Sequence, residues 1–246
     1  MDNIERAKQG FEKSFSEKDF YNRQTQDDKH LETIFNMMEF KDGDKILDFG
    51  AGSGYLSFAI AKKYPNCSVV GLDIVSNTLE QNRLYALAQG IDNIEFIDYD
   101  GITLPFEDNV FDWVVTRYVL HHVPDIQNTF DEVSRILKPG GSFFISDPTP
   151  NCLDADRFVD AYMQLQNDGH NNFYTLSEFS EYAENARFNQ KQAHVTTIRF
   201  PRKIDQSYID LLKKTDTVIK QAYKIEIIND ECFIVEDVLN IVFQKQ

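Results

Sequence analysis

The residues from Ile46 to Gly54, which read ILDFGAGSG, could hold a small ligand against bare backbone. Apolar Ile46 and Leu47 predict a buried parallel strand, and from Gly50 onward every second residue is glycine. Glycine allows the tight turn that such a loop needs and leaves no side chain between the main chain and the ligand. The segment therefore predicts the strand, loop and helix at which α/β proteins bind nucleotides.

The glycine spacing and the acid before it indicate which nucleotide would bind. Dinucleotide-binding loops read G-x-G-x-x-G, whereas here the third glycine, Gly54, comes one residue early. Asp48 would repel a pyrophosphate, which needs helix N-terminal amides and no nearby anion. It would attract a ligand with an ammonium and a sulfonium group, as in S-adenosylmethionine, with the loop amides left for its carboxylate. The pattern thus disfavours a dehydrogenase.

DFGAGSG resembles motif I of the class I S-adenosylmethionine-dependent methyltransferases. Three further blocks follow in that family's order: VVGLDIVSNTLEQNR from Val69, IEFIDYDGITLPFEDNVFDWVVTRYVLHHV from Ile94, and EVSRILKPGGSFFISD from Glu132. The resemblance covers residues 45–147, and the chain is most similar to the small-molecule subgroup that includes quinone-biosynthesis C-methyltransferases. It implies methyl transfer from S-adenosylmethionine to a carbon, oxygen or nitrogen of a small-molecule acceptor.

The expected cofactor site is built from the ends of the first four strands. Asp73 ends a strand about 20 residues beyond the glycines, where an acid can accept both ribose hydroxyls, a helix cap being the alternative. The resemblance implies that Asp100 accepts from the adenine amino group. Asp98 competes for this role, and a surface Asp-Gly turn is the other alternative. Tyr21 resembles an N-terminal tyrosine that closes over the cofactor, or is an exposed structural residue. The full predicted set is Tyr21, Asp48, Gly50, Ala51, Gly52, Gly54, Asp73, Ile74, Asp100, Gly101, Arg117, Tyr118 and His122.

The acceptor half of the site is less defined by the sequence. Residues just past the carboxyl end of a strand face the ligand crevice of an open α/β sheet. At least one of the residues after the fourth strand should therefore line the methionine end of the cofactor, the candidates being Arg117, Tyr118, His121 and His122. Consecutive residues do not share a helix face, so the paired histidines are not expected to bind one ligand together. The alternative is that one histidine packs and the other only borders the cofactor. The candidate catalytic residues are His121, His122, Asp147 and His170, without a choice among them, and no metal site is predicted.

The chemistry of methyl transfer explains why the sequence predicts the cofactor half of the site better than the acceptor half. The enzyme mainly aligns the reactants and removes water, and a general base is needed only when the acceptor must lose a proton. The sequence therefore describes the cofactor half of the site and leaves the acceptor open.

A Rossmann-like α/β fold, doubly wound and mostly parallel, should position these residues, with seven strands of which the last is antiparallel. Core strands are predicted at 45–49, 68–72, 94–98, 111–116 and 141–146. The run Tyr55 to Lys63 has helical spacing, and Pro139-Gly140-Gly141 predicts a turn before the fifth strand. Residues before Asp42 are expected to form helices whose apolar stripe packs on the sheet.

The sequence changes character after Asp147. Thr175 and Glu178 fit a capping box that opens a helix at 176–186, and strands are expected at 194–200 and 233–243 with helical periodicity at 207–223. Residues 148–190 are predicted to form a helical lid that brings His170 and Tyr174 near the acceptor, a solvated connection being the alternative. The chain is thus expected to be one domain, divided into a helical cap (1–44), a cofactor-binding core (45–147), the lid (148–190) and C-terminal strands with a helix (191–246).

Composition excludes several other classes. The chain has 246 residues and is 42% hydrophobic, enough for one sizeable core, and its net charge of −15 disfavours a nucleic-acid partner. Its three cysteines lack a C-x-x-C pair, which disfavours a disulfide framework or a structural zinc. No apolar run approaches the roughly 18 residues of a membrane span, so the expected location is cytoplasmic. An RNA or protein methyltransferase, or a cofactor-binding module without catalysis, remain the alternative functions.

Overall fold

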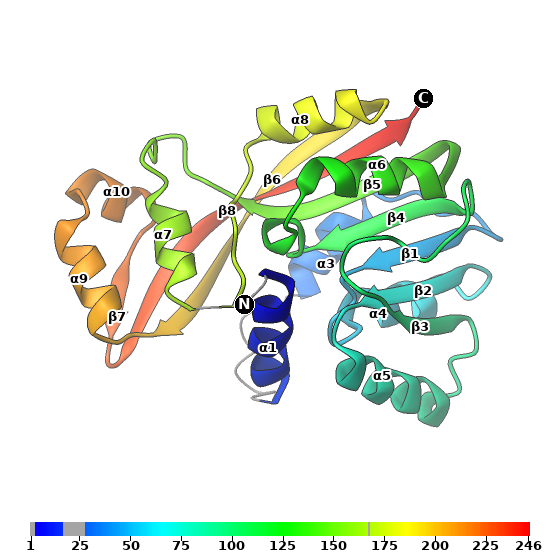
Figure 1. Cartoon of the computed structure of the whole chain (residues 1–246), viewed down its shortest axis with the longest axis horizontal. Helices are drawn as coiled ribbons and strands as arrows, with labels where there is room; N and C mark the ends of the chain where they lie inside the picture. The colour runs from blue at the N-terminus through cyan, green and yellow to red at the C-terminus, as the bar shows by residue number, and fades with distance from the viewer. Residues whose placement is uncertain (1–2, 17–27, 167) are drawn as a thin grey trace.

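The computed structural model describes residues 3–16, 28–166 and 168–246 of the chain. Its centre is an eight-stranded sheet in the order β3-β2-β1-β4-β5-β8-β6 (Figure 1). The eighth strand, β7, pairs with residues 231–233 of β8, which lie beyond the part of β8 that pairs with β5. The strands are β1 (Lys45–Phe49), β2 (Ser68–Asp73), β3 (Ile94–Asp98), β4 (Phe111–Arg117), β5 (Leu137–Thr149), β6 (Phe188–Lys203), β7 (Glu226–Ile228) and β8 (Glu231–Lys245). Strands β1 to β5 pair in parallel, whereas β6, β7 and β5 all pair with β8 in antiparallel fashion.

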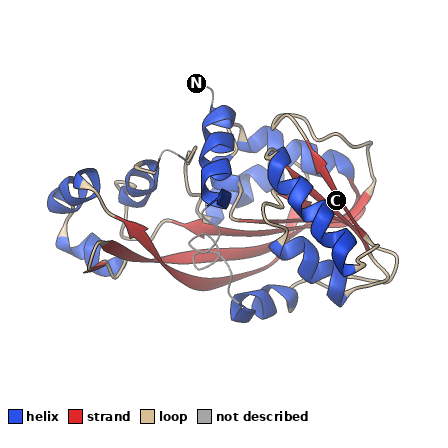
Figure 2. Cartoon of the chain, turned by 90° about the horizontal axis from the view of Figure 1, so that it is seen from below, coloured by secondary structure: helices blue, strands red, loops and turns tan. Residues whose placement is uncertain are grey.

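Helices cover both sides of this sheet (Figure 2). The described helices are α1 (Asn3–Ser16), α3 (Asp28–Phe35), α4 (Tyr55–Lys63), α5 (Ser76–Gln89), α6 (Ile126–Ile136), α7 (Phe158–Gln164), α8 (Leu176–Asn185), α9 (Gln206–Lys214) and α10 (Thr217–Ala222), with a short 3-10 helix η1 (Leu120–His122). The predicted Rossmann-like fold is confirmed. The described residues form eight strands rather than the predicted seven, because the short β7 adds to β8.

Neighbouring residues of a central strand pack on opposite faces of the sheet, as the two-residue period of a strand requires. Phe143 of β5 joins the core under α6 and α8, where it meets Phe130. Phe144, the next residue, joins the core under α3 and α4, with Ile34 and Ile60. Burial on both faces explains why the central strands read as continuous apolar runs.

Two local predictions need correction. Pro139 to Gly141 form no turn ahead of the fifth strand. They lie inside β5, where the pairing jumps from Phe111–Leu137 to Trp113–Ser142, so the extra residues bulge out of the ladder. The helical run predicted at 207–223 is two helices, since α9 ends at Lys214 and the side chain of Asp216 caps α10. The capping box of Thr175 and Glu178 at the start of α8 is confirmed.

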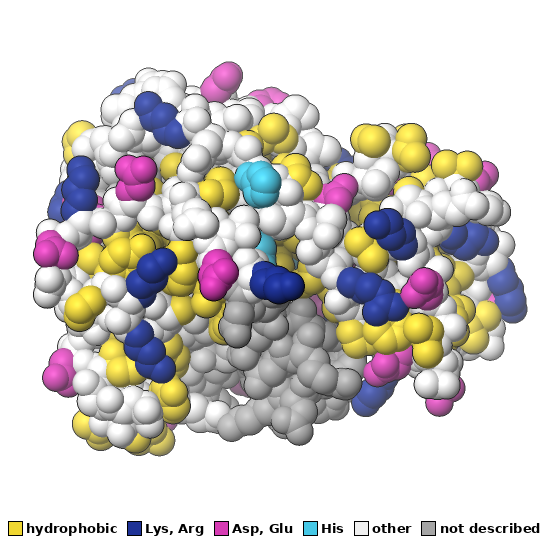
Figure 3. All heavy atoms as spheres, turned by 180° about the vertical axis from the view of Figure 1, so that it is seen from behind, with side chains coloured by type: hydrophobic (Ala, Val, Ile, Leu, Met, Phe, Trp, Pro, Cys, Tyr) yellow, Lys and Arg dark blue, Asp and Glu magenta, His cyan; other side chains and the backbone are white. Residues whose placement is uncertain are grey.

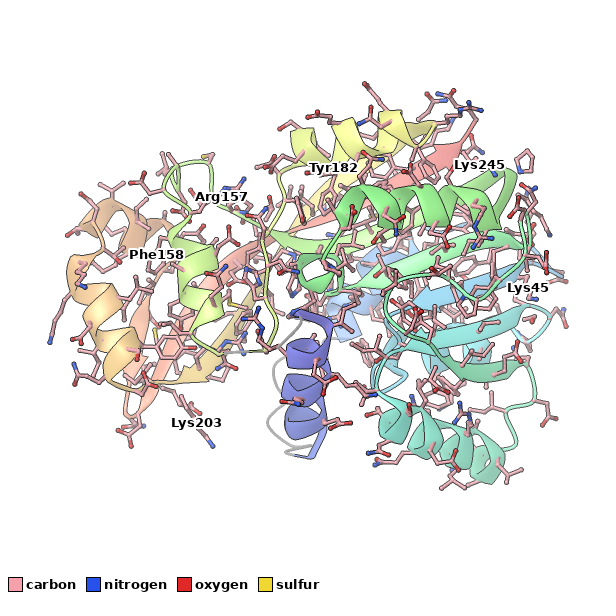
Figure 4. All side chains as sticks on the ribbon, in the orientation of Figure 1. Lys45, Arg157, Phe158, Tyr182, Lys203 and Lys245 are labelled. Atoms are coloured by element: carbon pink, nitrogen blue, oxygen red, sulfur yellow. The ribbon has the colours of Figure 1, made fainter. Side chains whose placement is uncertain are left out.

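Strands β6 and β8 extend past the end of β5 and pack there with further helices around a second hydrophobic core. We call this the distal lobe: α7, α9, α10, and the parts of β6 and β8 at 198–203 and 231–236. Its core is rich in aromatic side chains and includes Phe158, Tyr162, Phe173, Phe200, Tyr208, Tyr223 and Ile234. The distal lobe, which holds Arg157, Phe158 and Lys203 in Figure 4, lies at the opposite end of the molecule from Lys45 at the start of β1. In Figure 1, α1 lies between the distal lobe and the carboxyl ends of β1 and β4.

Candidate functional site

The glycine loop between β1 and α4 is held in a conformation that side chains would strain. Gly50, Gly52 and Gly54 have φ of 79°, 49° and 76°, in the left-handed region. A Cβ on Gly50 would also overlap the side chain of Val119. The loop therefore needs glycine both for its backbone angles and for its close approach to the segment after β4.

The amides of this loop are already paired, which the sequence did not predict. Gly50 and Ala51 donate to the carbonyl of Leu72 at 2.8 and 2.9 Å, and Gly54 donates to the carbonyl of Ala51 at 2.8 Å. Gly52 donates to Oδ2 of Asp73 at 2.8 Å. The expectation that these amides are left free for a ligand carboxylate is therefore wrong for these four.

Asp48 lies behind the loop. Its side chain is only 2% exposed and accepts a hydrogen bond from the hydroxyl of Ser57 in α4. Burial raises the pKa of Asp48 to about 7. Because Asp48 does not line the pocket described below, its predicted contact with a ligand ammonium stays a prediction.

A pocket opens at the carboxyl ends of β1, β2 and β4, beneath α1. It encloses about 690 Å³ including its open mouth. Its wall is mostly apolar, with a few polar groups. The lining residues are Ile4, Ala7, Phe11, Phe49, Gly50, Gly52, Asp73, Ile74, Tyr99, Gly101, Arg117, Tyr118, Val119, His122, Val123 and Pro124.

Seven of the predicted cofactor residues thus meet in one pocket. They are Gly50, Gly52, Asp73, Ile74, Gly101, Arg117 and Tyr118, with His122 as an eighth that was also a catalytic candidate. The other described residues of that set lie next to the pocket without lining it, namely Asp48, Ala51, Gly54 and Asp100. Tyr21 lies outside the described residues.

Asp73 ends β2 and faces the pocket. Its two oxygens accept from the amides of Gly52 and Val75, at 2.8 and 3.0 Å. Burial raises its pKa. A carboxylate has about four lone-pair sites, so these two bonds leave Asp73 with further accepting capacity.

The two acids after β3 point elsewhere in this structure. Asp98 accepts from the hydroxyl of Ser76 at 3.2 Å and lies 3.6 Å from the guanidinium of Arg83. Asp100 accepts from the amides of Ile102 and Thr103, and these bonds lower its pKa. Only their neighbours in sequence, Tyr99 and Gly101, line the pocket.

Arg117, at the end of β4, places a positively charged guanidinium on the pocket wall, against two tyrosine rings. The guanidinium of Arg117 lies 4.1 Å from the ring centre of Tyr118 and 5.2 Å from that of Tyr55. It also lies 3.4 Å from Nδ1 of His30 in α3. Tyr118 has φ of 60°, which turns the chain out of the strand direction, and burial raises its pKa to about 12.

Asp147, at the end of β5, holds the turn that carries the paired histidines. It is fully buried and accepts from the amides of Val119 and Leu120, both at 3.0 Å, and its Oδ1 forms a hydrogen bond of 2.6 Å with Nδ1 of His121. Burial raises the pKa of Asp147 to about 8. The carboxyl group therefore fixes the backbone that places His122 on the pocket wall.

The paired histidines have separate roles, as their spacing indicated. His121 points inward to Asp147, whereas His122 lines the pocket and its Nδ1 has no hydrogen-bond partner among the described residues. Their ring centres are 4.1 Å apart. Burial lowers the pKa of both histidines far below the usual value. The charge of His170 lowers the pKa of His121 further, and the charges of His121 and His170 lower the pKa of His122 further. Both rings are therefore neutral near pH 7.

The predicted lid residues reach this cluster to different extents. The ring of His170 lies 5.4 Å from that of His121 and 6.2 Å from that of His122, and its Nε2 lies 2.8 Å from Oδ1 of Asp160 in α7. His170 is buried beside these two histidines and does not itself line the pocket. Tyr174 instead packs in the core against α8. The lid itself stays a prediction.

Asn171 fastens this loop to η1. Its side chain donates to the carbonyls of His122 and Val123, each at 2.9 Å, and its amide donates to the carbonyl of His121 at 2.8 Å. The loop after α7 and the turn after β4 therefore form one connected wall.

Residues 40–198 match a family model described as a methyltransferase domain. The chain belongs to this methyltransferase family. The chain is 32% identical over 136 residues to the uncharacterized methyltransferase YcgJ of Bacillus subtilis (strain 168), which covers 55% of this chain and 53% of the relative. It is 33% identical over 141 residues to a demethylmenaquinone methyltransferase of Geobacillus kaustophilus (strain HTA426), which covers 56% of this chain and 60% of the relative. The methyltransferase chain thus spans little more than half the length of these relatives.

Solved structures show the same fold. The crystal structure of YcgJ from Bacillus subtilis superposes with a TM-score of 0.75 at 22% identity, covering 88% of this chain and 97% of that one. A geranyl diphosphate methyltransferase superposes with a TM-score of 0.63 at 19% identity, covering 87% of this chain and 75% of that one. At these identities the likeness concerns the fold of this methyltransferase domain alone.

The sequence interpretation missed the contribution of α1 to the pocket. Ile4, Ala7 and Phe11 recur at intervals of three and four residues and so share one face of the helix, which covers the crevice. That periodicity was a usable signal, although it could not show which surface the stripe covers. No group of three or more metal-ligating side chains occurs among the described residues. None of its described helices combines the length and apolarity needed to cross a bilayer.

Proposed function

We propose that this chain transfers a methyl group from S-adenosylmethionine to a small-molecule acceptor. The observation that carries the proposal is the pocket at the carboxyl ends of β1, β2 and β4, where the glycine loop and Asp73 meet the neutral His122. A pocket at that edge is where open α/β sheets bind ligands. Membership of the methyltransferase family supports the reaction class.

The residues present fit the proposed cofactor. Asp73 keeps accepting capacity for ribose hydroxyls, and the backbone at Gly101 is bare beside Ile74 and Tyr99, where a flat base could lie. When bound, S-adenosylmethionine supplies an electrophilic methyl carbon on a positively charged sulfur. The apolar wall and α1 would keep water away from that methyl group.

His122 is the residue best placed to receive a proton from the acceptor. It is the candidate catalytic residue that lines the pocket, and its imidazole is neutral near pH 7 and so able to accept a proton. His121 and Asp147 position it from behind through the turn that they hold. A carbon, oxygen or nitrogen nucleophile that must lose a proton would therefore pass it to His122.

A small molecule fits the pocket better than RNA or a protein. The pocket is small and mostly apolar, and the chain carries a net charge of −15. On the face shown in Figure 3, basic side chains are separated by acidic and apolar ones instead of forming a continuous basic surface. Small-molecule acceptors also appear in the names of similar proteins, which include demethylmenaquinone and sterol methyltransferases.

The test has a binding step and a turnover step. Calorimetry should show that S-adenosylmethionine and S-adenosylhomocysteine bind with micromolar affinity, whereas NAD does not bind. Methyl-labelled S-adenosylmethionine incubated with fractionated cell metabolites should then label a small-molecule fraction, and His122→Ala should reduce that labelling even when S-adenosylmethionine is saturating. Tight NAD binding without S-adenosylmethionine binding would refute the proposal.

A further inference from the structure

Helix α1 crosses the pocket from one end to the other. Ile4 lies beyond the end of β3, where a Cβ on Gly101 would be 3.0 Å from Cγ2 of Ile4. Phe11 lies beyond the end of β4, where its ring meets that of His122 edge-on, with the ring centres 4.9 Å apart. Both side chains of α1 line the pocket, and the two helical turns between them span about 10 Å. The two ends of the pocket can therefore be assigned separately.

The Ile4 end of the pocket suits the adenosine part of the proposed cofactor. Asp73, at the end of β2, keeps accepting capacity for the ribose, and the backbone of Gly101 is bare beside Ile74. Strands β3, β2, β1 and β4 are neighbours in that order, so the methionine part of the cofactor would extend toward β4. The transferable methyl group would then lie at the Phe11 end, where the acceptor must meet it.

The side chains that line the Phe11 end are uncharged. They are Phe11, Val119, His122, Val123 and Pro124. The imidazole of His122 supplies the polar atoms of this set, it is neutral near pH 7, and its Nδ1 has no hydrogen-bond partner among the described residues. This end of the pocket therefore offers an apolar surface with one neutral polar group.

Two charged residues flank this end and are engaged elsewhere. Arg117, two residues before Val119, stacks on two tyrosine rings and lies beside a histidine of α3. Asp168, whose charge acts on His122, accepts from the amide of His170 and does not line the pocket. A charged group of an acceptor would lose its water at this end without gaining a partner of opposite charge, which is costly.

We propose that Phe11 selects the methyl acceptor by packing against an uncharged, apolar skeleton that carries the atom to be methylated. This inference rests on the proposed function and adds to it the chemical class of the acceptor. Aromatic contacts stabilise beyond the apolar area that they bury, so the Phe11 ring favours a ring or hydrocarbon chain beside it. A hydroxyl on such a skeleton fits next to His122, whereas a phosphate ester or a zwitterion does not.

The experiment uses three probes that share a benzene ring and differ in charge: phenol is neutral, benzoate is an anion, and benzylamine is a cation near pH 7. Ligand-observed NMR measures their binding to the protein saturated with S-adenosylhomocysteine. Phenol should bind at least about tenfold tighter than either charged probe, because neither charge finds a partner. Phe11→Ala should weaken phenol binding about threefold to tenfold, the effect of one aromatic contact, and leave S-adenosylhomocysteine affinity within about twofold.

Three variants locate the effect on α1. Phe11→Leu keeps an apolar side chain, so it should retain part of the phenol affinity. Glu12→Ala changes the next residue, which is exposed, and should alter the binding of neither ligand. Ile4→Ala should weaken S-adenosylhomocysteine binding and leave the phenol affinity of the saturated protein unchanged, because Ile4 lies at the other end of the pocket.

The outcomes separate this inference from the proposed function. Phenol binding that is no tighter than that of the charged probes, or that is unchanged in Phe11→Ala, would overturn the role of Phe11 alone. Loss of S-adenosylhomocysteine binding in Phe11→Ala would also overturn it, because Phe11 would then hold the cofactor instead of the acceptor. Failure of S-adenosylhomocysteine to bind the wild type would overturn the proposed function as well.

Discussion

The acids at the ends of β1, β2 and β5 in the parallel part of the sheet have hydrogen-bond partners, whereas one buried acid at the border of the distal lobe has none among the described residues. In the parallel part, Asp48, Asp73 and Asp147 each accept hydrogen bonds from nearby backbone or side chains. At the border of the distal lobe, Glu236 accepts none from the described residues. Oδ2 of Asp160 in α7 likewise lacks a hydrogen bond there, although it lies 3.7 Å from the guanidinium of Arg157.

The difference indicates where each part of the molecule is complete on its own. Acids at the ends of β1, β2 and β5 tie loops together, so they fix the shape of the cofactor half before any ligand binds. Glu236 holds no loop in place, and no hydrogen bond among the described residues offsets the cost of burying it. Stability should therefore depend on the first group of acids and much less on Glu236.

The largest expected effect is on Asp147. Asp147→Ala would leave the amides of Val119 and Leu120 and the ring of His121 without their acceptor. Leaving buried donors unpaired costs about 1–3 kcal/mol each, so the free energy of unfolding should fall by about 3–5 kcal/mol. Urea denaturation measures this change.

The comparison depends on the contrast with Glu236→Leu, which removes a carboxyl of similar burial. That variant should be no less stable than the wild type, since no partner is lost. Equal destabilisation by Asp147→Ala and Glu236→Leu would show that the two parts of the molecule do not differ in this way.

The next effect concerns ligand binding by Asp73. Asp73→Ala should weaken S-adenosylhomocysteine binding by about 1.5–3 kcal/mol for each charge-assisted hydrogen bond lost, as measured by calorimetry. Asp98→Asn is the matched control and should change little, because Asp98 pairs with Ser76 and Arg83 away from the pocket. Asp100→Asn should weaken binding if the side chain turns to the adenine. A larger loss from Asp98→Asn than from Asp100→Asn would reverse the predicted roles of these two acids.

Sequence patterns predicted the parts of the fold whose causes are local. The strand β1, the glycine loop and α4 could be placed to the residue, because apolar run, glycines and helical spacing follow one another without a gap. The bulge at Gly140 could not be predicted, because a Pro-Gly-Gly run fits a turn as well as a bulge. The pairing of β5 with β4 decides between the two. The burial of Glu236 could not be predicted either, because an acid in an alternating strand is expected to face solvent, and only the folded distal lobe covers it.

Stability should fall as the pH rises from about 6.5 to 8, where only the buried acids titrate. Burial raises the pKa of Asp48 to about 7 and those of Asp147 and Glu236 to about 8, so the stability from their protonated forms is fully present below the ordinary carboxyl pKa near 4 and is lost as the pH rises through 7–8. The pKa values of His121 and His122 are lowered, so their contribution is present above about pH 6.5 and lost as the pH falls below it.

Thermal melting across this range measures both limbs of the curve. Glu236→Gln should flatten the decline between about pH 6.5 and 8, whereas Asp237→Asn should not, which separates one acid from the total. A protein that becomes more stable between about pH 6.5 and 8 would contradict the assignment of raised pKa values to these acids.

The smallest expected effect tests how α1 closes the cofactor half against the loop after α7. A Cβ on Gly10 would lie 2.8 Å from the Cα of Asp168, and one on Gly169 would lie 2.8 Å from the backbone of Ala7, so these backbones touch. Gly10→Ala should push α1 from the loop while gaining about 1 kcal/mol of helix propensity, leaving stability within about 1 kcal/mol of the wild type. S-adenosylhomocysteine should then bind about threefold to tenfold more weakly by calorimetry, because α1 forms part of the pocket wall. Gln9→Ala, an exposed change on the same helix, should leave affinity unchanged, and equal affinities in the two variants would mean that α1 does not need this contact to cover the pocket.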